Sequence, residues 1–153
     1  MSSGIVFKSE THVLMGYQPD KSMISGIGGK PIGNETPIET AFRETIEELF
    51  GLQPSKILMD VLLDNFGFKQ EVKNDSYTMF IYTIDELLRF LCVVKSHSGS
   101  SPYYRNFPTS LDSLLFDRRT PLGVEVSHLC MVPIIHLPFH VDQRDMKIIG
   151  WEV

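Results

Sequence analysis

The sequence of 153 residues is poor in cysteine and lacks long apolar runs. Its two cysteines, Cys92 and Cys130, stand far apart without Cys-x-x-Cys or Cys/His spacing, which favours buried, reduced thiols over a zinc site or a structural disulfide. No run approaches the roughly 18 apolar residues that a membrane helix needs. The first ten residues also lack the basic and apolar regions of a signal peptide. We therefore expect a cytoplasmic protein without a membrane partner.

Basic residues are scarce as well. Lysine and arginine number 14 against 19 aspartate and glutamate residues, which gives a formal charge of −5. A long nucleic-acid footprint needs clustered lysine and arginine, so extended nucleic acid is a disfavoured partner, while capped RNA stays open. Part of the acidity is consistent with a cation site.

The chain has the size and apolar content of one compact unit, since 42% of its residues are hydrophobic. No internal repeat or long linker divides it, so we expect a single domain over residues 1–153. An insertion is expected at about residues 84–121, because the Ser/Pro/Gly-rich stretch at 96–109 suits an insertion loop better than a domain boundary.

Periodicity and turn signals predict an α/β fold in which mixed strands pack between helices. Strands are expected at residues 4–8, 11–17, 56–66 and 76–84, with one more inside 124–137 that ends at Pro133 or Pro138. Helices are expected from a Thr36 cap to near Gly51, from an Asp85 cap to the loop formers at 96–99, and inside 110–119. The last fifteen residues are ambiguous.

The strongest local signal is the first of these helices. Thr36 as N-cap, Pro37 at the first helical position and Glu39 complete a Thr-x-x-Glu capping box. One apolar stripe follows at spacings of three and four, made by Ile38, Phe42, Thr45, Leu49 and Leu52. The segment before the helix, residues 25–31, is too glycine-rich for a helix or a central strand. It predicts a tight turn or a close approach of the backbone.

Three carboxylates share one face of this helix, opposite the apolar stripe. Glu44, Glu47 and Glu48 stand at positions i, i+3 and i+4, so their like charges repel each other. A hard divalent cation such as Mg²⁺ or Mn²⁺ would compensate this repulsion, because it prefers oxygen ligands. Arg43 lies beside Glu44 and four residues before Glu47, where it can orient the carboxylates. The plain alternative is a solvated acidic helix face.

The wider spacing resembles the signature of the Nudix hydrolases over residues 29–52. From Gly29 the chain passes five residues to Glu35, seven more to Arg43-Glu44, and then the segment TIEELFGL. The family pattern has the same glycine, glutamate and Arg-Glu spacing, followed by Glu-Glu and a glycine. The sequence is therefore similar to this family in every charged position of the pattern.

Two positions depart from the family pattern. Thr45 replaces an aliphatic residue, which its β-branched shape makes tolerable. Phe50 adds one residue before Gly51, so the exit of the helix is lengthened.

The resemblance implies a Nudix-type α/β/α sandwich with a mixed β-sheet. It implies Mg²⁺ or Mn²⁺ held by Glu44, Glu47 and Glu48, with Arg43 in the catalytic group and the backbone carbonyl of Gly28 as a further ligand. The implied reaction is metal-assisted attack of water on a phosphoanhydride. Members of the family commonly draw one more carboxylate from a later segment, for which we favour Glu125. The other candidates are Asp112, Asp117 and Glu71.

The substrate that we favour is a nucleoside diphosphate derivative, foremost a nucleoside triphosphate or a related small nucleotide. The stretch Gly-Ile-Gly-Gly-Lys ending at Lys30 is similar to Gly-Phe-Gly-Gly-Lys of enzymes that clear oxidised purine nucleoside triphosphates. Tyr103, Tyr104 and Arg105 are candidates for contact with the base, or else they pin a long loop to the core.

Two alternatives to this function stay open, namely hydrolysis of an mRNA cap or cap nucleotide and a non-catalytic Nudix-fold module that binds a nucleotide. A homodimer is also left open.

Overall fold

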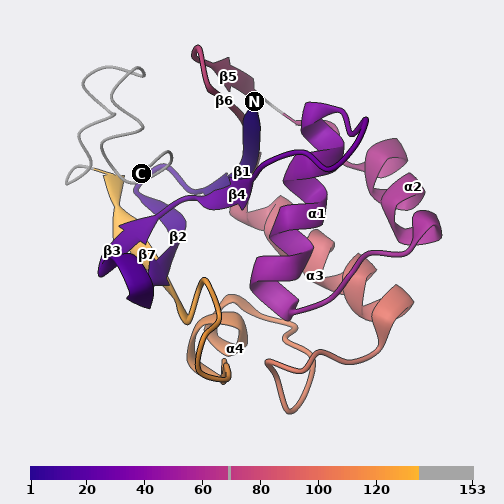
Figure 1. Ribbon diagram of the computed structural model, residues 1–153. Helices are drawn as coiled ribbons and strands as arrows, with labels where there is room; N and C mark the ends of the chain where they lie inside the picture. The colour runs from indigo at the N-terminus through magenta and orange to yellow at the C-terminus, as the bar shows by residue number, and fades with distance from the viewer. Residues whose placement is uncertain (69, 135–153) are drawn as a thin grey trace.

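The computed structural model describes residues 1–68 and 70–134, and its elements are arranged as one mixed sheet with helices against it (Figure 1). The seven strands are β1 Ser2–Lys8, β2 His12–Gln18, β3 Met23–Ser25, β4 Ile27–Gly29, β5 Gln70–Lys73, β6 Tyr77–Thr83 and β7 His128–Pro133. The helices are the short 3-10 helix η1 Pro19–Lys21, then α1 Pro37–Phe50, α2 Lys56–Asn65, α3 Ile84–Ser98 and α4 Leu111–Phe116. The predicted α/β class is confirmed.

The sheet runs in the order β3-β2-β1-β6-β5, with β4 added beside β1 and β7 beside β2. Strands β1 and β6 are parallel, while every other pairing is antiparallel, so the sheet is mixed. β1 and β2 pair at Lys8 and Val13, whereas the first half of β1 pairs with β4. β4 therefore lies beside the start of β1, and the chain continues from β4 into α1.

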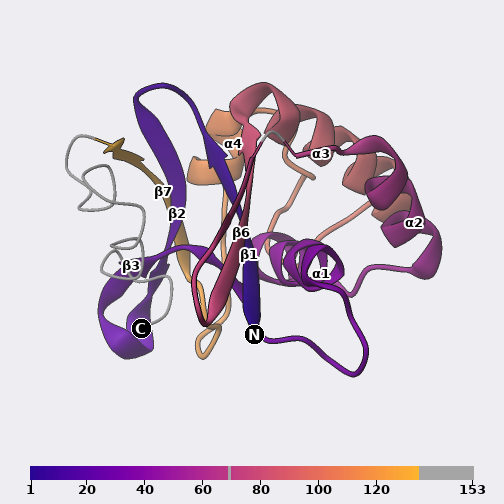
Figure 2. The same cartoon turned by 90° about the horizontal axis from the view of Figure 1, so that it is seen from above.

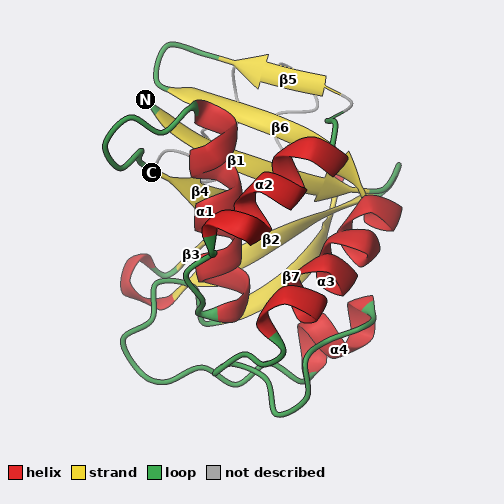
Figure 3. Ribbon diagram, turned by 90° about the vertical axis from the view of Figure 1, so that its right-hand side faces the viewer, coloured by secondary structure: helices red, strands yellow, loops and turns green. Residues whose placement is uncertain are grey.

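Helices α1, α2 and α3 cover one face of the sheet (Figures 2 and 3). Side chains alternate across the strands, so Phe7 and Tyr82 enter the core beneath these helices and meet Phe42 and Phe90. A second apolar cluster lies on the opposite face of the sheet and includes Val13, Met15 and Met79. Described residues supply no helix to that second face, and residues 135–153 lie outside the description. The second helical layer of the predicted sandwich is therefore not seen in the described part.

Helix α1 has the boundaries that its sequence predicts. The Thr36 hydroxyl accepts a hydrogen bond from the Glu39 backbone N–H, and the Glu39 carboxylate accepts one from the Thr36 N–H. Gly51 ends the helix in the left-handed region at φ 66°, a conformation that glycine adopts without strain. Thr45 is fully buried at its substituted position, and its hydroxyl donates to the Ala41 carbonyl at 2.7 Å. The polar atom is thus satisfied inside the helix.

The strand predicted at 56–66 is wrong, because this segment is helix α2. Ser55 caps it by accepting a hydrogen bond from the Leu58 backbone N–H. Leu58 and Leu62, four residues apart, are its buried side chains, which is helical rather than strand spacing. The antiparallel partner of β6 is instead β5, a short edge strand in a polar stretch that buries only Val72, while β1 pairs with β6 on its other side.

Three smaller expectations also need correction. The cap of α3 is Thr83, whose hydroxyl accepts from the Glu86 N–H, rather than Asp85. The glycine-rich segment contains the short strand β4, although its close backbone approach is as expected. Of the cysteines predicted to be buried, Cys92 is exposed, and both thiols are free. No helix formed by the described residues is both long and apolar enough to cross a membrane.

Candidate active site

Arg43 is the centre of a network that fastens the loop before α1 to the helix. Its guanidinium donates to the Glu35 carboxylate at 2.7 and 3.0 Å and to the Lys30 carbonyl at 2.8 Å. On its other side it donates to Glu44 at 3.0 Å and Glu47 at 3.2 Å. The planar guanidinium can serve several acceptors at once, which a lysine ammonium cannot do with the same geometry.

The Glu35 carboxylate is held from the loop side as well. It accepts hydrogen bonds from the Ile32 backbone N–H at 2.8 Å and from the Thr40 hydroxyl at 3.0 Å. The Arg43 hydrogen bonds, followed by these contacts, lower the pKa of Glu35 against the opposing effect of burial. Glu35 is therefore an ionised anchor that orients Arg43.

Glu48 lies inside the molecule rather than on a solvated face. Glu48 as a whole is 8% exposed, and neither of its carboxylate oxygens has a hydrogen-bond partner. The Gly28 backbone N–H lowers the pKa of Glu48 and the Glu44 side chain raises it, but neither lies in hydrogen-bond geometry with the Glu48 oxygens. Burial, followed by the charges of Glu125 and Glu44, raises the pKa of Glu48 well above its ordinary value of 4.5. An unpartnered buried carboxylate is costly, so this position calls for a compensating ligand or proton.

Glu44 lies beside Glu48 on the glycine-rich side of the helix. Burial raises its pKa, with smaller contributions from the charges of Glu47 and Glu125, although its bond to Arg43 opposes the change. A side chain at Gly29 would run into the Glu44 carboxyl group, and one at Gly28 would run into the Tyr77 hydroxyl. Gly28 therefore lets β4 lie close to β1 and to Tyr77, whereas a methyl group at Gly29 would displace the flexible Glu44 carboxyl group.

Glu47 lies at the outer side of the carboxylate group and is already paired. It accepts hydrogen bonds from Arg43 and, at 2.8 Å, from the Gln53 side chain. Its side chain is 25% exposed, against 15% for Glu44. The three predicted carboxylates are thus unequal, since Glu48 is buried without a hydrogen-bond partner while Glu47 is half-buried and hydrogen-bonded.

The structure brings Glu125 near this group. The residue is exposed in the segment before β7, and its charge raises the pKa of both Glu44 and Glu48. Of the other candidates, Glu71 pairs with Lys73 at 2.9 Å, and Asp117 lies beside Tyr104. Glu125 is therefore the candidate whose surroundings suit an additional ligand.

The donor set fits a hard cation in chemical type. The charges of Glu44, Glu48 and Glu125 influence one another, and the two oxygens of Glu48 have no hydrogen-bond partner among the described residues. Within residues 1–68 and 70–134, however, no three acidic, histidine or cysteine side chains are grouped closely enough to form a ready metal site. Binding Mg²⁺ or Mn²⁺ here would require side-chain rotation that brings these oxygens together.

Arg118 belongs to the surroundings of the site, and sequence reasoning missed it. It is 6% exposed and donates to the carbonyls of Glu48 at 2.6 Å and Leu49 at 2.5 Å. It also donates to the carbonyls of Val126 at 2.9 Å and Ser127 at 3.3 Å. Its partners are backbone atoms, and those on α1 lie 69 and 70 residues away, so no motif could have predicted the contact.

The three residues proposed to contact a base have different surroundings. Tyr104 is 5% exposed, and its hydroxyl donates to the Leu114 carbonyl, so its ring packs in the core, and its contact with a base stays a prediction. Tyr103 is half-buried and lies under the Arg118 guanidinium, 5.0 Å from its ring centroid. Arg105 and Lys30 are exposed. The aromatic residues of this loop thus mainly hold it in place.

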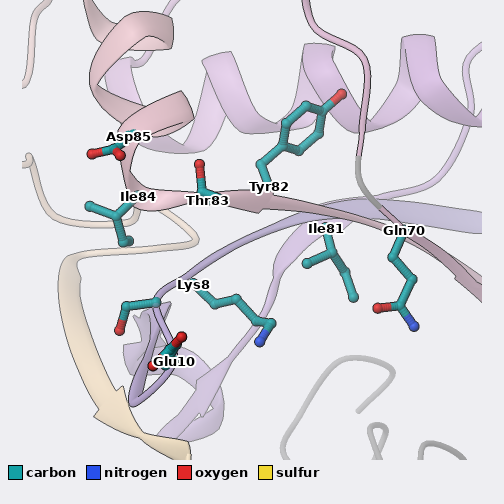
Figure 4. Close-up of a pocket in the computed structure, with 9 residues that line it drawn as sticks. Lys8, Glu10, Gln70, Ile81, Tyr82, Thr83, Ile84 and Asp85 are labelled. Atoms are coloured by element: carbon teal, nitrogen blue, oxygen red, sulfur yellow. The ribbon is translucent and has the colours of Figure 1, made fainter.

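A cavity of about 540 Å³ lies away from these carboxylates (Figure 4). It is lined by residues at the ends of β1 and β6 and at the start of α3, among them Lys8, Thr83 and Asp85. Figure 4 shows Tyr82 directed toward the helices and Ile81 directed to the other side of the strand. Gly4, the neighbour of Gly28, stands nearer the opposite end of β1. The cavity is therefore separate from the acidic group.

Comparisons with known proteins give a limited result. No family model matches the sequence, and no curated protein matches it. Among solved structures, the chain is similar to a hydrolase of the Nudix family from Clostridium perfringens, with 18% sequence identity over 86% of this chain and 78% of that chain. The TM-score of this match is 0.39, so it carries no argument about the activity of this protein.

Proposed function

We propose that the protein is a divalent-metal-dependent pyrophosphohydrolase of the Nudix type, which cleaves a phosphoanhydride bond in a nucleoside diphosphate derivative. The favoured substrate is a nucleoside triphosphate or a related small nucleotide. The observation that carries the proposal is the bare, buried carboxylate of Glu48 between the charges of Glu44 and Glu125. A purely structural helix would not keep such a group without a partner.

In this proposal the chain's own residues divide into ligands and supports. Glu44, Glu47, Glu48 and Glu125, with the carbonyl of Gly28, would hold Mg²⁺ or Mn²⁺. A bound cation would neutralise charge on the phosphate oxygens and acidify a water molecule. Arg43 would keep Glu44 and Glu47 turned toward the same side of α1, as its hydrogen bonds to both support.

The glycine-rich strand supports a role in phosphate approach. Gly28 and Gly29 pair with the start of β1; a side chain at Gly28 would meet the Tyr77 hydroxyl and the β1 backbone, and one at Gly29 would meet the Glu44 carboxyl group. A backbone without side chains lets a phosphate chain come close to the carboxylates. Lys30, exposed directly after this strand, has the charge to attract the phosphates.

The test is a screen for hydrolysis with and without Mg²⁺, with products identified by mass spectrometry. It covers nucleoside triphosphates, oxidised nucleotides, nucleotide sugars, dinucleotides and cap analogues, and it compares wild type with Glu48→Gln. Glu39→Gln is the matched control, because Glu39 lies on the same helix and its capping contact uses one oxygen that glutamine retains. Turnover that needs Mg²⁺ and is lost in Glu48→Gln alone supports the proposal.

One observation favours a second candidate, a nucleotide-binding module without catalysis. The described residues contain no group of three metal-binding side chains already in place. Such a module would bind a nucleotide tightly and release no product from any compound in the screen. Cleavage restricted to cap analogues would instead assign the protein to the cap hydrolases.

A further inference from the structure

Arg118 joins two parts of the chain that both carry acidic residues of the candidate site. Its guanidinium bonds the Glu48 and Leu49 carbonyls in the last turn of α1. The same group bonds the Val126 and Ser127 carbonyls, directly after Glu125. One planar side chain therefore sets the separation between the backbone of Glu48 and the backbone beside Glu125.

The end of α1 provides a suitable place for a buried cation. The last turn of α1 contains no basic residue, and its outward carbonyls carry the partial negative charge of a helix C-terminus. Arg118 satisfies these carbonyls from outside the helix. Within the described part of the chain no ion pair includes Arg118, so its charge is balanced by backbone oxygens. The Tyr103 ring covers its guanidinium at 5.0 Å.

The segment that carries Glu125 needs such a tether. Residues 117–127 contain no helix or strand, and Figure 1 shows this stretch passing from α4 to β7, to the left of the lower end of α1. The Arg118 hydrogen bonds place the backbone beside Glu125 against the end of α1, and the charge of Glu125 acts on both Glu44 and Glu48. Repulsion favours an outward position for an exposed carboxylate on an irregular segment. Hydrogen bonds from Arg118 oppose this displacement.

We propose that Arg118 is a positioning residue that holds Glu125 beside Glu44 and Glu48 by binding the end of α1 and the Val126–Ser127 backbone together. It makes the additional carboxylate available as a cation ligand without touching the cation or the substrate. The inference rests on the proposed function, because it assigns to Arg118 the positioning of a ligand at that same site.

The test measures the binding of Mn²⁺ alone, by electron paramagnetic resonance, in wild type and in Arg118→Lys. Lysine keeps the charge but cannot bond both backbone segments in the same plane. Loss of a residue that orients a metal ligand without binding the metal lowers metal affinity by about 10-fold. Arg119→Gln is the matched control, because Arg119 is exposed and its side chain donates to the Phe116 and Arg118 carbonyls but not to α1 or to the Val126–Ser127 backbone.

A second variant and a double variant separate positioning from a general loss of structure. Tyr103→Leu keeps Arg118 but removes its cover, so it should weaken Mn²⁺ binding in the same direction by a smaller factor. In the Glu125→Gln background, Arg118→Lys should cause no further loss of Mn²⁺ affinity, since the residue that it positions is already neutral. A merely structural role would add its loss in both backgrounds.

The outcomes distinguish this inference from the proposed function. If wild type binds Mn²⁺ and hydrolyses a nucleotide, while Arg118→Lys binds Mn²⁺ as tightly as Arg119→Gln, the positioning role is overturned alone. Losses that multiply in the double variant overturn it as well. A wild type that neither binds Mn²⁺ nor hydrolyses any nucleotide overturns the proposed function, and the inference falls with it.

Discussion

Replacing Glu48 by glutamine should stabilise the metal-free protein while abolishing its proposed activity. Glu48 is 8% exposed, its carboxylate oxygens are buried without a hydrogen-bond partner, and the charges of Glu125 and Glu44 act on it. Glutamine has almost the same shape but no charge. Removing a buried charge without partners should raise the free energy of unfolding by about 1–3 kcal/mol, less whatever the unpaired amide costs. In a chain of this size, each kcal/mol shifts the Tm by about 2–4 °C.

The pH dependence of this gain follows from the raised pKa. Between the ordinary value of 4.5 and the raised value in the fold, the folded protein holds a proton that the unfolded chain has released. The stability of wild type therefore falls as the pH rises through this window, with a limiting slope of about 1.4 kcal/mol per pH unit. Glu48→Gln has no proton to lose there. The two proteins should be equally stable below pH 4.5, and the variant should be more stable at neutral pH.

The assay is urea unfolding of both proteins in EDTA over this pH range, followed by the same experiment in excess Mg²⁺. Mg²⁺ should stabilise wild type by about 2.7 kcal/mol at one hundred times its dissociation constant, and the variant much less. In excess Mg²⁺, wild type should then be as stable as Glu48→Gln or more stable. A variant that is equally stable or less stable than wild type at neutral pH without metal would refute the description of Glu48 as a costly bare charge.

Three further predictions concern the residues around this group. Gly29→Ala should lose Mg²⁺-dependent turnover, because the new methyl group meets the Glu44 carboxyl, whereas Gly67→Ala, where space is open, should keep wild-type rates. Arg43→Lys should reduce kcat by about 10- to 100-fold and lower the free energy of unfolding in urea, because lysine cannot bond two carboxylates and a carbonyl together. Tyr104→Phe should cost about 1 kcal/mol in urea unfolding and leave KM unchanged, since its hydroxyl bonds a core carbonyl; a raised KM would restore its role in substrate contact.

The parts of the fold that were predictable are those whose signals are local. Helix α1 could be bounded from Thr36 to Gly51 because capping residues act within one turn. The segment at 56–66 is a helix rather than the predicted strand, and its short apolar run suits a buried strand as well as a helix. The missed signal was Ser55, an N-cap with helical spacing of Leu58 and Leu62 behind it.

The candidate site shows the same division. Arg43 and its carboxylates follow from spacing along one helix, and the structure adds hydrogen bonds from this arginine to Glu44 and Glu47. The burial of Glu48 could not be read from that spacing, because it depends on β4 and on the segment before β7. The role of Arg118 could not be predicted from the sequence, because backbone carbonyls accept its hydrogen bonds and any residue type supplies such a carbonyl.

The most direct test of the account is the initial rate of nucleotide hydrolysis at saturating Mg²⁺ for wild type, Glu48→Gln and Glu39→Gln, with the best substrate from the screen. We expect Glu39→Gln to match wild type, and Glu48→Gln to lose at least about 100-fold in rate, because loss of a cation ligand removes several kcal/mol of transition-state stabilisation. Equal rates in all three proteins, or a rate that does not depend on Mg²⁺, would contradict the assignment of these carboxylates to a catalytic cation site.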